Sequence, residues 1–159
     1  MSDVLPGEAT RNTDRELASA FASSKERHLE TTAQGRAFMD ATVAVWSCDA
    51  LTRLEAIWPK PVAYPVAVGV AAAGHAIPMA PALGAYLHAV AANLISAGVR
   101  LIPLGQTAGQ RLLAELEPVV AAATQAAITT PLDEVGGATF RADIAGMRHE
   151  TQYTRLFRS

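Results

Sequence analysis

Cysteine is almost absent from this chain of 159 residues, because Cys48 is the only one and no disulfide can form within the chain. This composition suits a reducing compartment, so we expect a cytoplasmic protein. An excess of charge of one sign is also lacking, since 13 Lys and Arg residues stand against 15 Asp and Glu residues. We therefore expect no binding to nucleic acid or to an anionic membrane surface.

The first residues lack the apolar core of a signal peptide, and we expect a disordered segment over residues 1–11. Residues 83–104 are long enough to cross a membrane, but they are rich in alanine and glycine where leucine would be expected. Polar side chains also interrupt them, at His88, Asn93, Ser96 and Arg100. We therefore predict a buried central helix in this stretch and no membrane span.

Aromatic side chains are scarce, at 6% of the residues, although half of the chain is hydrophobic. Alanine supplies much of the apolar surface, and it favours helices that pack closely. No segment alternates convincingly between polar and apolar residues as a half-buried strand does. The sequence predicts an all-α fold. We expect a compact bundle of about six helices over residues 12–151 and a C-terminal tail, residues 152–159, that can be mobile.

Helix starts are marked by pairs in which a hydroxyl residue stands three positions before a glutamate or glutamine. Such a capping box satisfies backbone N–H groups that have no partner within the helix. The pairs are Thr13 with Glu16, Ser23 with Glu26, and Thr107 with Gln110. Prolines and glycines mark the breaks. Together these signals predict helices over residues 13–22, 23–47, 64–74, 79–101, 107–128 and 139–151, with Pro118 kinking or splitting the fifth.

Apolar residues at helical spacing predict which faces are buried. The second expected helix has a stripe flanked by Phe38 and Val45, made of Met39, Val43 and Trp46. The stripe of the fifth consists of Leu112, Leu116, Val119, Val120, Ala123 and Ala127. The last expected helix brings together Phe140, Ile144 and Met147. Small residues of the fourth would let neighbouring helices approach closely, namely Gly84, Ala85, Ala89, Ala92, Ser96 and Gly98.

Motifs for catalysis are incomplete. Residues 105–111 resemble a phosphate-binding loop, but they are one residue too short between the glycines and lack its lysine. His149-Glu150 opens like a zinc protease motif, yet no second histidine follows at helical spacing. Asp133 and Glu134 are neighbours that point apart, which is poor geometry for acid and base work. We therefore expect no catalytic residues and no metal site, and an enzyme using His149 and Glu150 is a remote alternative.

The C-terminus differs from an ordinary polar tail, because residues 147–159 combine arginines with apolar and aromatic side chains. Arginine and aromatic residues together are typical of the energetically important part of protein interfaces. We predict that this segment binds a partner and orders on contact. The alternative is that Leu156 and Phe157 dock on the chain's own core.

Three runs resemble the UreF family of urease accessory proteins. They are residues 147–159 (MRHETQYTRLFRS), residues 64–69 (YPVAVG) and residues 93–110 (NLISAGVRLIPLGQTAGQ). The run at 30–36 (ETTAQGR) is a weaker match. The resemblance covers about residues 10–159 in the family's order. The N-terminal helical region of the family, with its glycine-rich segment, has no counterpart here, so the resemblance implies a chain truncated at its N-terminus.

The resemblance implies an all-helical chaperone subunit, homodimeric within its complex, that is not an enzyme. It implies binding to UreD (UreH in some organisms), to the GTPase UreG and to apo-urease, in GTP-dependent nickel insertion. Nickel is the metal of that pathway, and no cofactor of the subunit's own is implied. The implied partner-binding residues are Arg148, His149, Glu150, Tyr153, Arg155, Leu156, Phe157 and Arg158. Structural or dimer-related roles are implied for Tyr64, Gln106, Thr107 and Gln110. A generic helical scaffold, or a truncated member without function, remains an alternative.

Overall fold

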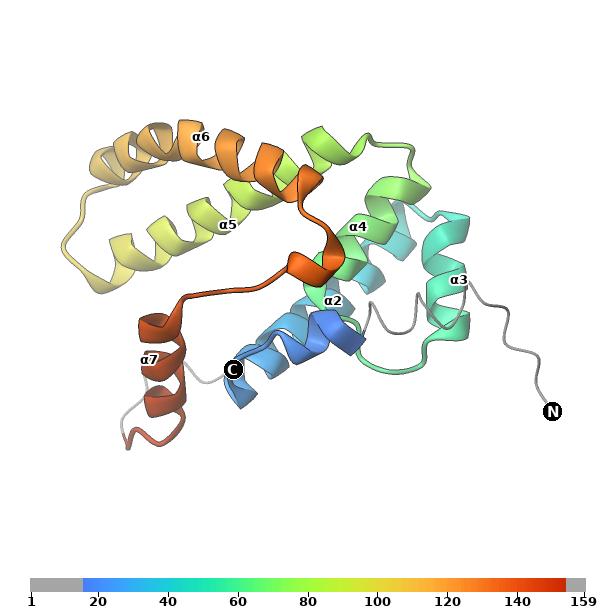
Figure 1. Cartoon of the computed structure of the whole chain (residues 1–159), viewed down its shortest axis with the longest axis horizontal. Helices are drawn as coiled ribbons and strands as arrows, with labels where there is room; N and C mark the ends of the chain where they lie inside the picture. The colour runs from blue at the N-terminus through green and yellow to red at the C-terminus, as the bar shows by residue number, and fades with distance from the viewer. Residues whose placement is uncertain (1–15, 154–159) are drawn as a thin grey trace. The chain divides into compact units, whose positions relative to one another are not determined.

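The structure is a computed structural model and describes residues 16–153. Within this stretch all regular elements are helices and no strand occurs, which confirms the predicted all-α fold (Figure 1). The elements are α2 (Lys25–Val45), α3 (Asp49–Ile57), α4 (Tyr64–Gly74), α5 (Met79–Leu101), α6 (Gln106–Thr129), the short 3-10 helix η1 (Leu132–Glu134) and α7 (Phe140–Glu150). Residues 16–20 are also helical. Thr13 and the segment 1–11 lie outside the described residues.

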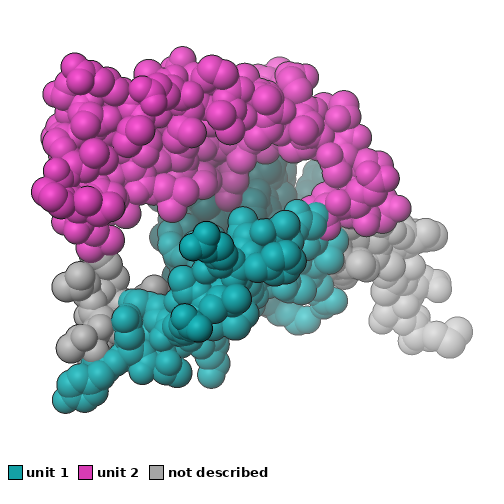
Figure 2. Space-filling view, turned by 60° about the vertical axis from the view of Figure 1, so that its left-hand side comes forward, with its two compact units in different colours: residues 1–75, 136–159 teal, residues 76–135 magenta. Residues whose placement is uncertain are grey.

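Two compact units make up the chain, and Figure 2 colours them separately. Unit 1 joins residues 1–75 to residues 136–159, so it contains α2, α3, α4 and α7. Unit 2 consists of residues 76–135 and contains α5, α6 and η1. Unit 1 is therefore built from two separate parts of the sequence, with unit 2 inserted between them.

The hydrophobic core of unit 1 lies where α4 packs against α2 and α3. Leu51 and Leu54 of α3 are its largest fully buried side chains, and their three-residue spacing places them on one face of that helix. The other buried members of this core are Met39, Trp58, Val62, Ala67 and Ala71. Small alanines on α4 suit the close approach of three helices, so the alanine-rich composition has the packing role that it indicated.

Helix α3 was missing from the sequence prediction, which left the segment between the second helix and the prolines unassigned. The helix begins after Cys48 and ends at Ile57, directly before the Trp58-Pro59 break. Its signal was short, because nine residues allow only one repeat of the apolar spacing. Burial of Leu51 and Leu54 stabilises this helix more than its own propensity does.

Helix α2 begins one residue later than its predicted capping box implied. The N-cap is Ser24, whose hydroxyl accepts a hydrogen bond from the Arg27 N–H at 3.2 Å. The predicted pair of Ser23 with Glu26 is therefore wrong, since Glu26 interacts with α7 instead. On the expected stripe Met39 is buried and Val43 packs on the core, but Trp46 is 67% exposed. Trp46 is already the C-cap residue, where the helical spacing no longer applies.

Unit 2 contains a hairpin of two long helices, because α5 and α6 pack against one another (Figure 1). The prediction of a buried central helix is wrong, since no residue of α5 is buried. One helix can cover only one face of its partner, so the remaining faces of α5 stay exposed. Of the small residues expected at close approach, Gly84 lies near Thr124, since a Cβ on it would be 3.7 Å from the Thr124 hydroxyl, whereas a Cβ on Gly98 would meet nothing within 4 Å.

Helix α6 departs from prediction in its start. It begins at Gln106 after the N-cap Gly105, which has no side-chain cap, so Thr107 lies inside the first turn and is not a capping residue. The extended backbone of Gly105 makes the turn into the helix without a hydroxyl. The helix then continues through Pro118 to Thr129, so of the two predicted effects of this proline the split is wrong and the kink stays a prediction.

The packed face of α6 is rotated from the predicted stripe. Leu116 and Val120 are half-buried as expected, but Leu112, Val119, Ala123 and Ala127 are exposed. The residues that face α5 instead include the two buried residues of the helix, Gly109 and Thr124. Two helices come closest where side chains are small, so glycine and threonine occupy the contact and the bulky residues lie beside it.

By length and composition, α5 and α6 are each apolar enough to cross a membrane. One or two such helices are weak evidence of a membrane span, although neither of these is buried as the core helix of a soluble protein is. The expectation that the chain does not enter a membrane therefore stays a prediction.

Candidate partner-binding site

Two carboxylates and a histidine join the first turn of α2 to the last turn of α7. The Nδ1 atom of His149 lies 2.6 Å from Oε2 of Glu26. The backbone N–H of Glu26 donates to Oε1 of Glu150 at 3.2 Å. These contacts join residues 123 and 124 positions apart in the sequence. We call Glu26, His149 and Glu150 the α2–α7 clasp.

Helix-end electrostatics favour this clasp. The N-terminus of α2 carries unpaired N–H groups and partial positive charge, which the carboxylate of Glu150 satisfies. The C-terminus of α7 carries partial negative charge, and His149 lies in its last turn. The side chain of Glu26 is 17% exposed and that of His149 is 36% exposed, so their contact is partly shielded from solvent. Gly146 also approaches the Ser24 hydroxyl, since a Cβ there would lie 3.7 Å from Oγ.

The predicted partner-binding residues differ in whether they contact the chain itself or are exposed. His149 and Glu150 make intramolecular contacts and hold α7 on α2. Arg148 is exposed, and Tyr153 is 98% exposed. Arg155, Leu156, Phe157 and Arg158 lie outside the described residues. The sequence showed only that His149 and Glu150 have no second histidine at the spacing of a metal site. Nothing in it indicated that they contact α2.

The expected apolar stripe of α7 is exposed. Phe140, Ile144 and Met147 stand at helical spacing, and Phe140 is 68% exposed. The side of α7 that meets α2 carries the clasp residues and Gly146 instead. The helical spacing grouped the three apolar residues correctly, but the prediction that their face is buried is wrong. An exposed apolar stripe beside Arg148 has the composition of a protein interface.

Tyr64 has a packing role at the start of α4. Its backbone N–H donates to the Thr31 hydroxyl at 3.2 Å, and its ring meets that of Phe38 edge to face at 5.7 Å. Both partners are on α2, so Tyr64 helps to seat α4 on that helix. Gly35 makes this possible, because its missing side chain leaves room for the backbone at Val62 and Tyr64.

Gln106 and Gln110 line a pocket of about 300 Å³ near the turn between α5 and α6. Arg100 and Ser96 line it from α5, and an Arg100 Nη1 donates to the Ser96 hydroxyl at 3.3 Å. Thr107 is exposed and is not among the lining residues. The structure therefore brings both expected glutamines together with Arg100, for which the sequence predicted no binding or structural role.

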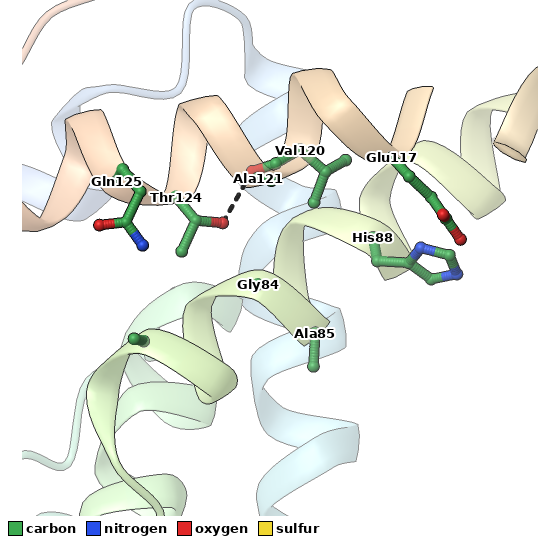
Figure 3. A pocket seen from close by; sticks show the side chains of 9 residues that line it. Gly84, Ala85, His88, Glu117, Val120, Ala121, Thr124 and Gln125 are labelled. Carbon is green, nitrogen blue, oxygen red and sulfur yellow. Dashed lines mark hydrogen bonds between the residues drawn. The ribbon is translucent and has the colours of Figure 1, made fainter. Parts of the chain in front are cut away.

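A second pocket, of about 460 Å³, lies between the other ends of α5 and α6 (Figure 3). Small side chains form most of it, and the hydroxyl of the buried Thr124 donates to the Val120 carbonyl at 2.8 Å. His88 and Glu117 stand on facing helices at its rim (Figure 3). Between residues 16 and 153, no three His, Cys, Asp or Glu side chains gather where they could hold a metal ion.

The sequence model of the UreF family matches residues 9–117 of the chain, which is well over half of its length. The chain belongs to the UreF family. It is 58% identical over 154 residues to the urease accessory protein UreF of Bradyrhizobium diazoefficiens. It is also 58% identical over 144 residues to the UreF of a Rhodopseudomonas palustris strain, and 59% identical over 148 residues to that of another Bradyrhizobium.

Similarity to these UreF proteins extends beyond the stretch matched by the family model. The alignment with the Bradyrhizobium diazoefficiens protein covers 96% of the chain, so it must include α7 and the clasp. The shares for the other two relatives are 91% each. The chain in turn spans only 60–64% of the length of these three UreF proteins.

Proposed function

We propose that this chain is a urease accessory subunit without catalytic activity of its own. It acts in the cytoplasm as a chaperone in the assembly of the urease metal centre. Together with UreD and the GTPase UreG it assists GTP-dependent nickel incorporation into apo-urease. Nickel is then the cargo of the pathway and not a resident cofactor of this chain. Membership of the UreF family supports this proposal, because the named relatives are urease accessory proteins.

The α2–α7 clasp is the observation on which the assigned binding surface depends. It fixes the end of α7 through Glu26, and it leaves Arg148 and Tyr153 free to meet another protein. A preorganised element loses less conformational freedom on binding than a frayed terminus does. The surface formed by α7 and the residues after it therefore supports a role in binding UreD or UreG.

The test is co-purification of the tagged chain with UreD and UreG expressed together. Three forms are compared: the whole chain, a form that ends at Thr151, and Arg53→Ala. Arg53 is an exposed arginine on α3, so its substitution controls for the loss of one surface charge. We expect the whole chain and Arg53→Ala to retain UreD or UreG, and the shortened form to lose about tenfold or more of the captured protein.

The outcomes test the chaperone assignment and the role of the tail in turn. Capture by none of the forms, with the full-length Bradyrhizobium diazoefficiens UreF capturing both partners in parallel, contradicts the chaperone assignment for this chain. Equal capture by the whole and shortened forms supports UreD or UreG as a partner but contradicts the role of the tail in binding it. Equal capture is also the result that a generic helical scaffold, the alternative function, predicts.

A further inference from the structure

The acidic side chains of α7 lie on the side of the helix that meets α2. Glu150 accepts the backbone N–H of Glu26 at 3.2 Å. Asp143 accepts a hydrogen bond from the Thr139 hydroxyl at 3.3 Å, at the start of its own helix. Asp143 and Glu150 are seven residues apart, which is close to two full turns, so they share one side of α7. Both acidic groups of the helix therefore make contacts within the chain.

The two arginines of α7 lie on the side turned away from α2. Arg141 and Arg148 are also seven residues apart, so they form a column about 10 Å long on that side. Each arginine stands two residues before an acidic residue of the other column, a step of about 200° around the helix. Both arginines are exposed. The charges of α7 are therefore segregated, with positive charge on its outer face.

The apolar stripe of α7 runs beside the arginine column. Phe140, Ile144 and Met147 stand at i, i+4 and i+7, and they are 68%, 49% and 49% exposed. An amphipathic helix inserts anchors at this spacing into a groove of another protein. Ile144 is the neighbour of both arginines on the helix surface, because Arg141 precedes it by three residues and Arg148 follows it by four. The stripe and the column thus form one continuous face.

This face specifies the chemistry of what covers it. Burying the stripe requires an apolar surface, and an arginine that loses water on contact needs acceptors in return. Carboxylates suit this need best, because the guanidinium binds their two oxygens at once. The arginines border the stripe on one flank only, so the complement is an apolar groove with carboxylates along one edge. A lipid surface fits less well, since α7 offers it three apolar anchors and two cations.

We infer that α7 docks its outer face in an apolar groove of its partner protein, with acidic side chains along the edge that meets Arg141 and Arg148. Phe140, Ile144 and Met147 fill the groove, and the two arginines determine the direction in which the helix lies in it. The inference rests on the function proposed above, because the partner is the UreD or UreG that the α7 surface recruits. It adds the side chains that make the contact and the chemistry that receives them.

The test is photo-crosslinking of the whole chain to co-expressed UreD and UreG. Benzoylphenylalanine replaces Phe140 in one form, and in the control it replaces Val119, an exposed apolar residue of α6. We expect the Phe140 form to give about tenfold more crosslinked UreD or UreG than the control, because hot-spot contacts are local. Mass spectrometry of the product should map the crosslink to a partner segment that contains aspartate or glutamate.

The arginine column is tested in the Phe140 form by changing its charge. Arg141→Glu combined with Arg148→Glu should lower the crosslinked product about tenfold, whereas Arg53→Glu should leave it unchanged. Salt gives a second measurement that needs no charge reversal. Raising sodium chloride from about 50 to about 500 mM should reduce the product, because salt screens ion pairs, and the reduction should be smaller after Arg141→Gln with Arg148→Gln.

Several results would overturn the inference. One is a crosslink from position 140 to the chain itself or to a second copy in place of UreD or UreG. Another is an equal yield after charge reversal. Binding of the chain to phosphatidylserine vesicles that charge reversal abolishes would assign the face to a membrane instead. Capture of UreD or UreG without a crosslink at position 140 contradicts this inference alone, whereas capture of neither protein contradicts the proposed function as well.

Discussion

At the scale of single residues, one glycine allows α2 to pack against the start of α4 in unit 1. Gly35 is buried on α2, and a Cβ there would overlap the carbonyl oxygen of Val62 and lie 3.1 Å from the backbone N of Tyr64. Both atoms belong to the backbone entering α4, which cannot move aside as a side chain can. The residue that weakens α2 as a helix is therefore needed where α2 meets α4.

Replacing Gly35 by alanine should lower the free energy of unfolding by about 2 kcal/mol or more, because the backbone at Val62 must shift. Urea denaturation followed by circular dichroism measures this loss. The matched control is Gly69→Ala on α4, where nothing lies within 4 Å of the added methyl group. That substitution should raise stability by about 0.5–1 kcal/mol through helix propensity. Equal effects of the two substitutions would contradict the close approach at Gly35.

At the scale of elements, α7 depends on a few polar contacts. None of its residues is buried, and the clasp residues hydrogen-bond it to α2. A helix of eleven residues is marginal in isolation, so its order must come from docking. Glu26 contributes to both sides of this docking, through its carboxylate and through its backbone N–H.

Glu26→Ala should loosen α7, since it removes the partner of His149. We expect amide exchange within residues 140–150 to become about tenfold faster, which corresponds to the loss of one charge-assisted hydrogen bond of roughly 1.5 kcal/mol. Hydrogen exchange with mass spectrometry measures it. Glu30→Ala is the control, because its partners Arg27 and Gln34 lie on the same exposed face of α2, and such surface contacts contribute less than about 1 kcal/mol. Unchanged exchange in α7 of the Glu26 variant would show that the clasp does not hold the helix.

Sequence patterns identified most elements because proline and glycine mark their ends locally. The bounds of α4 and α5 matched the prediction for this reason. What could not be predicted depends on partners elsewhere in the chain. The local pattern favours Ser23 as the cap, because Glu26 stands three positions after it, but Glu26 contacts His149 and the cap is Ser24. The face of α6 depends in the same way on where α5 approaches Gly109.

The candidate site, like the fold, could be predicted only where the signal is local in the sequence. The composition of the last residues indicated a binding surface, and Arg148 and Tyr153 are exposed. The inward contacts of His149 and Glu150 could not be predicted, because Glu26 is more than 120 positions away. Arg100 was recognised only as an interruption of an apolar run, since nothing local indicates that two glutamines of the next helix share its pocket.

At the scale of the whole molecule, the two units differ in how much they bury. Unit 1 has a core that includes Leu51, Leu54 and Trp58. The buried residues of unit 2 are Gly109 and Thr124, which contribute little apolar surface. Both tryptophans of the chain, Trp46 and Trp58, belong to unit 1. Tryptophan fluorescence therefore reports unit 1, whereas circular dichroism reports the helices of both units.

Urea unfolding should consequently give two transitions that do not coincide. We expect the circular dichroism signal to fall first, because the α5–α6 hairpin loses its helices at a lower urea concentration than the core of unit 1 does. The fluorescence of Trp58 should change only in the second transition. A control with Trp46→Phe removes the signal of the exposed tryptophan. Coincident transitions by both measurements would instead mean that the chain unfolds as one cooperative unit.

The split of unit 1 around unit 2 has a consequence for the order of folding. During synthesis, α2, α3 and α4 leave the ribosome first and can form their core early. Helix α7 can reach Glu26 only after the whole hairpin has been made, and its docking closes a loop of more than 120 residues. The entropy lost in closing such a loop delays the contact. The surface proposed to recruit partners is thus the last part to be completed, so a nascent or incompletely folded chain would not yet present it.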